Sequence, residues 1–271
     1  MSPRAARDAQ APTPPLIDPR AIISPRAELA ADVTVGPFTI IGADVVIGPG
    51  TVIGPHAVIN GPTRMGAGNR VFQFASIGEA PQDKKHRDEP TRLEIGDRNI
   101  FREFCTIHRG TIHDRGVTQI GSDSLFMAYT HVAHDCSIGD NVVMANCATM
   151  GGHVGIGDFV QLGGLSALHQ FCQIGAHAFV GGGAIVSRDV PPYVTITGNP
   201  AVPHGVNAEG LKRRGFTPEQ IRNIRNAYRI LYRSELKLND ALQQLRTLAQ
   251  EQPELAILVE FIGRSQRSLQ R

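Results

Sequence analysis

Between Ile120 and Val190 the chain places one aliphatic or aromatic residue at every sixth position. The series is Ile120, Phe126, Val132, Ile138, Met144, Met150, Ile156, Leu162, Leu168, Ile174, Val180 and Val186. Four positions after each member stands a small or β-branched residue, in the order Ser124, Thr130, Cys136, Val142, Ala148, Val154, Val160, Ser166, Cys172, Ala178, Ala184 and Val190. A period of six fits neither an α-helix nor an ordinary strand, and it is typical of a parallel β-helix. We therefore expect each hexad to form one short strand with its corner, three hexads to close a triangular coil of about 18 residues, and both recurring positions to fill the interior.

The same period begins upstream and is interrupted twice. It runs without a break through Ile17, Ile23, Leu29, Val35, Ile41, Ile47, Ile53, Ile59, Met65, Val71 and Ile77. The charged stretch from Glu79 to Glu94 is too polar for the interior, and a second insertion, HDRGVTQ, precedes Ile120. Loops that interrupt a rigid repeat are commonly its binding face, so we expect both insertions to protrude from the prism.

These patterns divide the chain into a tail, a prism and a cap. Residues 1–15 have little to bury and are predicted to form a flexible N-terminal tail. Residues 16–206 are predicted to form the β-helix, and residues 207–271 a small C-terminal α-helical domain. A solenoid needs its last open coil covered, which is the role we expect for these helices.

Helix signals support that domain. Thr217 and Gln220 form a capping box, with Pro218 at the first helical position. Two further helices are expected, one after Asn239 and one from Pro253.

Composition narrows the class of protein. With 271 residues, 41% of them hydrophobic, the chain can bury a large core. A formal charge of +2 gives no reason to expect nucleic acid as a partner. No apolar run approaches the roughly 20 residues of a membrane span, and the N-terminus has no apolar segment like that of a signal peptide, so we expect a cytoplasmic protein.

Four histidines recur at nearly the same place in the coil. Counted within the 18-residue period, His108, His134, His153 and His169 should lie on successive coils along one edge, with His131 close by. Because corners point outward, the sequence predicts a polar column on the surface. Solvated corner histidines are the alternative. A metal site is not expected, because ligands on one face diverge and no Glu or Cys completes a tetrahedral set.

A histidine at such an edge is suited to acid–base chemistry. Imidazole titrates near neutrality and is the natural general base for activating a hydroxyl. The chain has no G-x-S-x-G motif to supply a nucleophilic serine, so direct transfer between two bound substrates is the simpler reaction. Asp135 adjoins His134 and could orient its ring, but only in a corner geometry, since neighbouring side chains of a regular strand diverge.

Several motifs resemble one enzyme family. QFASIGEAPQD, EPTRLEIGDRN, TIHRGT, HVAHDC, GGHV, HQFCQIGAH, DVPPYV and GVNAEGLKRRGF, spread over residues 73–216, closely resemble the acyl-[acyl-carrier-protein]:UDP-N-acetylglucosamine O-acyltransferases of lipid A biosynthesis. With the other hexads and the C-terminal helices, the resemblance covers about residues 16–271. Hexads alone are weakly specific, because serine, succinyl and sugar acetyltransferases share them, whereas the histidine motifs and GLKRRGF are specific.

The resemblance implies a left-handed parallel β-helix, a homotrimer and active sites in the clefts between subunits. It implies transfer of an (R)-3-hydroxyacyl group from the phosphopantetheine thioester of acyl carrier protein to the 3-hydroxyl of UDP-N-acetylglucosamine, with no cofactor of the enzyme's own. His134 matches the catalytic base, with Asp135 as its partner. Positions that match holders of the sugar nucleotide or the acyl donor are Asp83, Lys85, His108, His131, His153, His169 and Gln170. Those that match the uridine and phosphate end are Asn207, Glu209, Arg213 and Arg214, expected from the neighbouring subunit. Gly182 matches the position that sets acyl length.

Other interpretations remain at this point. Lys212, Arg213 and Arg214 could be a solvated basic stretch, and Asp83 and Lys85 could merely make a loop soluble. The same fold could serve N-acylation or a coenzyme A donor, or the prism could be a scaffold without chemistry. Product formed only from UDP-N-acetylglucosamine with an acyl carrier protein thioester would distinguish these possibilities.

Overall fold

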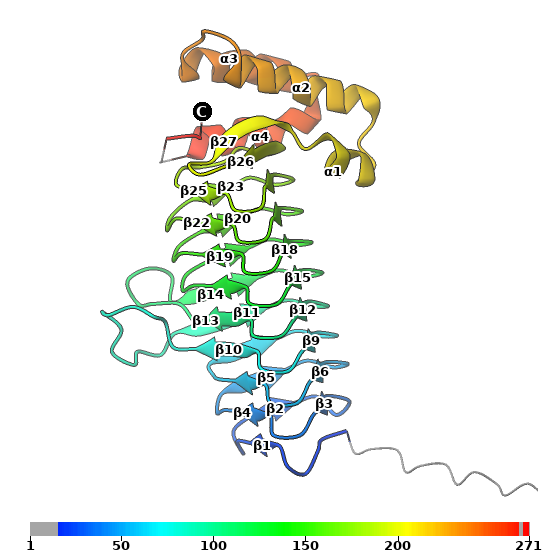
Figure 1. Cartoon of the computed structure of the whole chain (residues 1–271), viewed down its shortest axis with the longest axis vertical. Helices are drawn as coiled ribbons and strands as arrows, with labels where there is room; N and C mark the ends of the chain where they lie inside the picture. Colours follow the sequence, from blue (N-terminus) through cyan, green and yellow to red (C-terminus); the bar gives the residue numbers. More distant parts are fainter. Residues whose placement is uncertain (1–15, 266–267, 271) are drawn as a thin grey trace, which may run out of the picture.

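Short parallel strands stack into a prism, as the hexad pattern predicts. The computed structural model describes residues 16–265 and 268–270, so the tail predicted at residues 1–15 lies outside the described part of the chain. Within that part the strands form three sheets that run the length of an elongated molecule (Figure 1). Along most of the prism each strand pairs with the strand 18 positions later, as Val132 does with Met150. The parallel β-helix expected from the period is confirmed.

Each sheet takes one strand from nearly every coil. The first sheet contains, in spatial order, β1 (Ile22–Ile23), β4 (Ile40–Ile41), β7 (Val58–Ile59), β10 (Ser76–Glu79), β13 (Thr106–His108), β16 (His131–Val132), β19 (Thr149–Met150), β22 (Ala167–Leu168) and β25 (Ile185–Val186). The second contains β2 (Glu28–Leu29), β5 (Val45–Ile47), β8 (Thr63–Met65), β11 (Arg92–Ile95), β14 (Val117–Ile120), β17 (Ser137–Ile138), β20 (Gly155–Ile156) and β23 (Gln173–Ile174). The third contains β3 (Thr34–Val35), β6 (Val52–Ile53), β9 (Arg70–Val71), β12 (Ile100–Phe101), β15 (Leu125–Phe126), β18 (Val143–Met144), β21 (Gln161–Leu162), β24 (Phe179–Val180), β26 (Val194–Thr197) and β27 (Val202–Val206). This third sheet ends with β27, which pairs antiparallel with β26.

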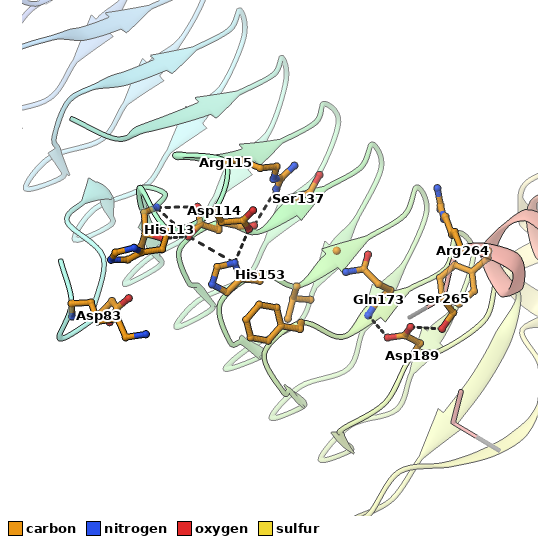
Figure 2. Close-up of a pocket in the computed structure, with 17 residues that line it drawn as sticks. Asp83, His113, Asp114, Arg115, Ser137, His153, Gln173, Asp189, Arg264 and Ser265 are labelled. Carbon is orange, nitrogen blue, oxygen red and sulfur yellow. Dashed lines mark hydrogen bonds and ion pairs between the residues drawn. The ribbon is translucent and has the colours of Figure 1, made fainter. Parts of the chain in front are cut away.

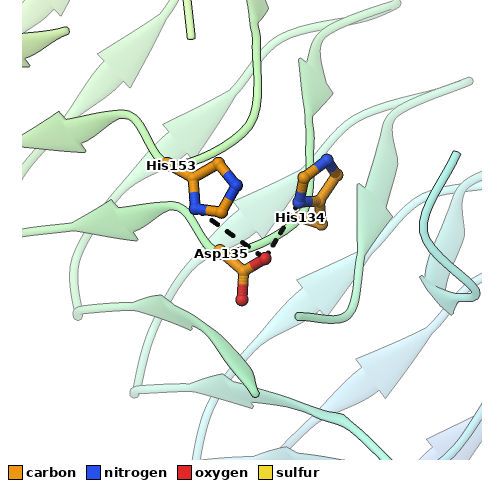
Figure 3. Close-up of side chains that lie close together, drawn as sticks. All are labelled: His134, Asp135 and His153. Atoms are coloured by element: carbon orange, nitrogen blue, oxygen red, sulfur yellow. Dashed lines mark hydrogen bonds and ion pairs between the residues drawn. The ribbon is translucent and has the colours of Figure 1, made fainter. Parts of the chain in front are cut away.

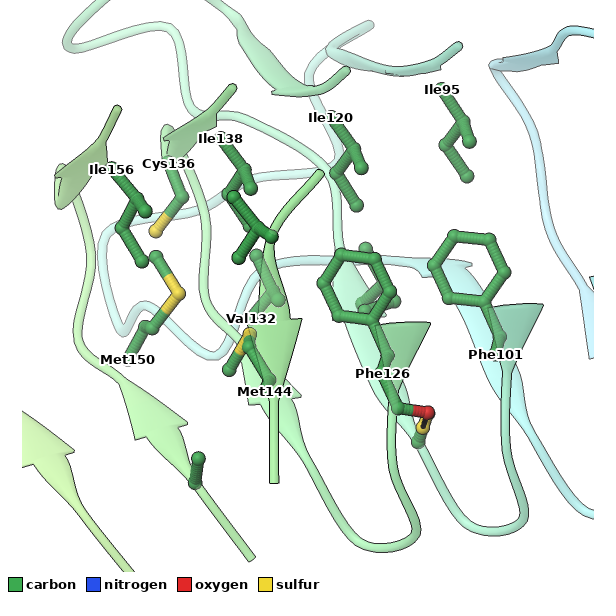
Figure 4. Close-up of a cluster of buried hydrophobic side chains, with 14 of the residues drawn as sticks. Ile95, Phe101, Ile120, Phe126, Val132, Cys136, Ile138, Met144, Met150 and Ile156 are labelled. Atoms are coloured by element: carbon green, nitrogen blue, oxygen red, sulfur yellow. Dashed lines mark hydrogen bonds between the residues drawn. The ribbon is translucent and has the colours of Figure 1, made fainter. Parts of the chain in front are cut away.

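The two recurring hexad positions form the core. Every member of both series between Ile120 and Val190 is buried, and the large residues line up from coil to coil (Figure 4). Phe101 and Phe126 stack on successive coils with their ring centroids 4.9 Å apart. Among the described residues the prediction is wrong only at the first coil, where Ile17 is 43% exposed and no described coil lies beneath it to cover its side chain.

Both insertions stand out from the same side of the prism (Figure 1). At the first, Ile77 pairs with Ile107, so 30 positions separate partners that are elsewhere 18 apart. At the second, Ile95 pairs with Ile120, 25 positions later. The sheets keep their register across both insertions because the extra residues leave the coil at its corner.

Helices cover the last coils. They are α1 (Ala208–Arg213), α2 (Pro218–Tyr232), α3 (Leu238–Ala249), the 3-10 turn η1 (Pro253–Leu255) and α4 (Ala256–Arg264). Both halves of the capping box at Thr217 and Gln220 are formed. Helix α3 begins two residues before its predicted start after Asn239, and the helix predicted from Pro253 starts there as η1 and continues as α4. Helix α1 was not predicted. The hydrophobic faces pack on one another and on Tyr193 at the end of the prism.

The boundary between the predicted domains falls in a short connection. Strand β27 ends at Val206, and Asn207 caps α1 by accepting from the backbone N–H of Gly210. Among the described residues, no helix has both the length and the hydrophobicity needed to cross a bilayer.

Candidate active site

The predicted histidines lie on successive coils along one corner of the prism. This corner joins the first sheet to the second, and we call it the histidine edge. His108 ends β13, His134 follows β16, His153 follows β19 and His169 follows β22. The column is therefore confirmed, but the expectation that it lies on the surface is wrong for His108, which is only 3% exposed.

His134 and Asp135 are joined by a hydrogen bond. Nδ1 of His134 lies 2.9 Å from Oδ2 of Asp135 (Figure 3). Asp135 has a φ of +59°, a left-handed corner conformation that Asp tolerates better than most residues. This corner allows two neighbouring side chains to meet, which a regular strand would not.

The carboxylate of Asp135 is buried yet ionised. Burial alone would raise the pKa of Asp135, but hydrogen bonds from His134 and Thr111 outweigh it and hold the pKa below its ordinary value. An ionised carboxylate can only accept hydrogen bonds, so Nδ1 of His134 carries the proton. The lone pair of Nε2 is left available to act as a base.

A glycine makes room for the His134 ring. A Cβ atom at Gly152 would lie 2.6 Å from Cε1 of His134, which is closer than real Cβ contacts come. Any side chain at this position would displace the imidazole. This steric requirement explains why glycine occupies the second position of the GGHV motif.

His153 stands next to the pair. Its ring meets that of His134 edge-on with centroids 5.0 Å apart, and its Nδ1 lies 2.7 Å from Oδ2 of Asp114 and 4.0 Å from Oδ2 of Asp135. Phe171, one coil further, stacks on His153 at 4.3 Å. Oδ2 of Asp135 therefore lies near the Nδ1 atoms of two imidazoles.

His108 and His131 form a second, drier pair. Their rings meet edge-on at 5.0 Å, and Nδ1 of His131 is hydrogen-bonded to the Thr106 hydroxyl at 2.7 Å. Burial lowers the pKa of His108 to about 4, with a smaller contribution from His131, and burial also lowers the pKa of His131. Both rings are neutral at physiological pH, and neutral imidazoles can position a substrate without adding charge.

Two hollows flank the histidine edge. The smaller, of about 450 Å³, is lined by His108, His131, His134, His169, Gln170 and part of the first insertion. The larger, of about 850 Å³, opens on the side of the second sheet and extends from the insertions to α4 (Figure 2). Asp83 and Lys85 line the larger hollow together with Asp135 and His153. The hydrogen-bonded pair of His134 and Asp135 therefore lies between the two hollows.

The remaining predicted residues lie elsewhere on the chain. Asn207, Glu209, Arg213 and Arg214 belong to α1 and its caps. Arg214 donates to the carbonyl of Phe159 at 2.8 Å, which ties this group to the corner between the second and third sheets. Gly182 is exposed at a corner after β24 and lines neither hollow. Within one chain, neither the α1 residues nor Gly182 lies at the histidine edge.

Three of the site residues also have the chemistry of metal ligands. One ligand atom each from His134, Asp135 and His153 lies within 4.8 Å of the others. Nδ1 of His134 and Nδ1 of His153 are each directed at a carboxylate. Imidazoles form such hydrogen bonds in the absence of a metal ion. That no metal takes part stays a prediction.

Several residues of the site were not singled out from the sequence, among them Thr106, Thr111, Asp114, Gly152 and Phe171. Asp114 belongs to the second insertion and Thr111 lies two residues before it, where the chain has no period from which their contacts follow. Phe171 could have been found, because it lies 18 positions after His153 and so occupies the same corner.

Comparison with known proteins agrees with the fold. A model described as bacterial transferase hexapeptide (six repeats) matches residues 26–61 and 118–152, which places the chain in the class of hexapeptide-repeat transferases. A second, described as UDP-N-acetylglucosamine O-acyltransferase domain 2, matches residues 189–270. The chain is 54% identical to the acyl-[acyl-carrier-protein]–UDP-N-acetylglucosamine O-acyltransferase of Halorhodospira halophila and 50% identical to that of Thiobacillus denitrificans, over 94% of this chain and 99% of each relative. The chain therefore belongs to this family and is an acyltransferase.

Solved structures of the family have the same fold. The UDP-N-acetylglucosamine acyltransferase of Francisella novicida superposes with a TM-score of 0.93 at 40% identity, covering 94% of each chain. The O-acyltransferase of Moraxella catarrhalis also has a TM-score of 0.93, at 45% identity over 94% of this chain and all of that one.

Proposed function

We propose that the protein transfers an (R)-3-hydroxyacyl group from acyl carrier protein to the 3-hydroxyl of UDP-N-acetylglucosamine, the first step of lipid A biosynthesis, with His134 as general base. The observation that carries the mechanism is the 2.9 Å contact between His134 and the buried Asp135. The substrates follow from family membership, because the relatives named above are acyl-[acyl-carrier-protein]–UDP-N-acetylglucosamine O-acyltransferases.

The reaction needs one base and no covalent enzyme intermediate. Nε2 of His134 takes the proton of the sugar hydroxyl as its oxygen attacks the thioester carbonyl. The new C–O bond forms, the C–S bond breaks, and the imidazolium returns its proton to the departing thiolate. Asp135 stabilises the imidazolium and holds the ring in the required tautomer, as the acid of a catalytic triad does.

The other residues of the edge are assigned to binding. His108, His131, His169 and Gln170 line the hollow that contains His134, where the acceptor sugar and the thioester would meet. Asp83 and Lys85 stand in the first insertion at the mouth of the neighbouring hollow. The acyl donor arrives on the phosphopantetheine arm of its carrier, so the enzyme needs no cofactor of its own.

The functional unit is a homotrimer with its sites between subunits. An aromatic ladder supports this proposal: Phe38, His56, Phe74, Phe104 and Tyr129 stack along the corner between the third and first sheets, with successive ring centroids 4.8–5.3 Å apart. Its Phe and Tyr residues are 42–58% exposed, and an extended apolar strip of this kind marks a protein interface. Arg213 and Arg214 would then reach the histidine edge of the next subunit.

The proposal places the protein in the cytoplasm, where its substrates are made. Two experiments test the substrates and the assembly. Purified enzyme is given UDP-N-acetylglucosamine with acyl carrier protein thioesters of several lengths, and the products are identified by mass spectrometry. A coenzyme A thioester and an amino-sugar acceptor serve as controls, and equal turnover of either would contradict the assigned substrates. Light scattering at micromolar concentration should give a trimer, and Phe104→Glu should dissociate it. An active wild-type monomer would contradict the assembly.

A further inference from the structure

The segment 111–118, which begins just before the second insertion, holds the carboxylate of Asp135 through Thr111. The backbone N–H of Thr111 donates to Oδ1 of Asp135 at 2.9 Å and to Oδ2 at 3.0 Å, and the Thr111 hydroxyl donates to Oδ2 at 2.7 Å. Thr111 is 2% exposed and Asp135 is 1% exposed, so water does not compete for these bonds. Bonds of this kind, to an ionised acceptor, are stronger than those between neutral groups.

The same segment also fixes the main chain of Asp135. The hydroxyl of Thr118 accepts from the backbone N–H of Asp135 at 2.8 Å, and Arg115 donates to its carbonyl at 3.0 Å. Thr111 is in turn held by the turn of the insertion, where the N–H of Gly116 donates to its carbonyl at 3.0 Å. The carboxylate and its backbone are therefore both held by residues about 20 positions earlier in the chain.

The hydrogen bonds from Thr111 determine which imidazole the Asp135 carboxylate accepts from. Oδ2 of Asp135 lies 2.9 Å from Nδ1 of His134 but also 4.0 Å from Nδ1 of His153. A modest rotation of the carboxylate would exchange one ring for the other. The Thr111 bonds oppose that rotation, and Asp114, from the same turn, occupies Nδ1 of His153 at 2.7 Å.

We propose that Thr111 is a positioning residue for acyl transfer, because its hydroxyl holds Asp135 in the orientation that directs His134. The inference rests on the proposed role of His134 as the general base. Thr111 is 2% exposed and its hydroxyl donates to Asp135. It acts through Asp135, so its loss should lower the rate of the chemical step and leave substrate binding nearly unchanged.

The test compares isosteric variants in steady-state kinetics. Thr111→Val removes the hydroxyl and keeps the shape and both backbone bonds. We expect kcat to fall about tenfold, equivalent to about 1.4 kcal/mol at 25 °C, with KM for UDP-N-acetylglucosamine changed by less than about threefold. Thr111→Ser, which restores the hydroxyl, should recover most of the rate.

Two further variants separate positioning from a loss of structure. Thr39 is equally buried and its hydroxyl donates to the carbonyl of Gly54 at 2.6 Å, far from the histidine edge, so Thr39→Val should keep the kcat of the wild type. In an Asp135→Asn background, Thr111→Val should change kcat by less than about twofold, because residues that act as a unit are non-additive. An undiminished effect in that background would overturn the inference, as would a Thr111→Val enzyme with the kcat of the wild type. If instead His134→Ala keeps the wild-type rate, the proposed mechanism itself is wrong.

Discussion

Nδ1 of His134 lies 2.9 Å from Oδ2 of Asp135, although side chains of neighbouring residues diverge in a strand. The contact exists because Asp135 occupies a corner of the prism with a φ of +59°. His134 is therefore hydrogen-bonded to a carboxylate and also lines the hollow that His131 and His169 line.

Replacing His134 should remove the base and spare binding. General-base catalysis typically contributes 10²–10⁴-fold, so we expect His134→Ala to lower kcat by about that factor with KM for UDP-N-acetylglucosamine nearly unchanged. His169→Ala is the control from the same edge. As a binding change it should act on KM at least as much as on kcat, and a His134→Ala enzyme that behaves in the same way would contradict the assignment.

Gly152→Ala should reproduce that loss without touching either member of the pair. The added methyl group would overlap the ring of His134, so the imidazole must move away from its present place. We expect kcat to fall by at least about tenfold, because a misplaced base loses most of its advantage. The melting temperature and subunit mass serve as controls for folding. A Gly152→Ala enzyme with normal kcat would show that the ring position in the free chain is not the catalytic one.

The stability of the protein should depend on pH through His108. Burial holds the pKa of His108 at about 4 in the folded chain, against the ordinary value of 6.5. Below about pH 6.5 the unfolded chain therefore takes up a proton that the folded chain refuses, and stability falls as the pH drops towards 4. Between pH 6.5 and 5 this one group should cost about 1.6 kcal/mol of unfolding free energy. Denaturant titrations at one protein concentration should show a shallower pH dependence for His108→Gln, and identical slopes would contradict the prediction.

The sequence predicted the repeat and its register better than the contacts within the site. The hexad period places each side chain inside or outside and assigns His134, His153 and His169 to one edge, because a repeat fixes position by counting. The contact of Thr111 with Asp135 joins residues 24 positions apart across an insertion with no period, so counting cannot reach it. The burial of His108 likewise depends on the residues around it at the histidine edge, and the hexad pattern does not predict how those residues are arranged.

Gly182 should set the acyl length that the enzyme accepts. The family resemblance assigns it to the end of the acyl pocket, and a Cβ atom here would approach Gly164 O to 3.3 Å, so a side chain fits with little movement of the backbone. Filling a groove beyond its capacity costs about 1–3 kcal/mol. We therefore expect Gly182→Met to lose activity with long acyl chains and to gain relative preference for shorter ones, with Gly182→Ala intermediate. Competition among mixed thioesters, read by mass spectrometry, would show an unchanged product distribution if the groove ended elsewhere.

Two inactive variants should restore each other if the site is shared between subunits. Arg213 belongs to α1 and does not line the hollow that contains His134 within one chain, which is why the proposed site needs a neighbour. In a closed ring each interface pairs one face of a subunit with a different face of the next. Co-expressed His134→Ala and Arg213→Ala chains should therefore form some interfaces in which both native residues meet. With random mixing about a quarter of the interfaces qualify, so activity should approach about one quarter of the wild-type value. Each variant expressed alone is the control, and a mixture no more active than the two parents together would place His134 and Arg213 in separate roles.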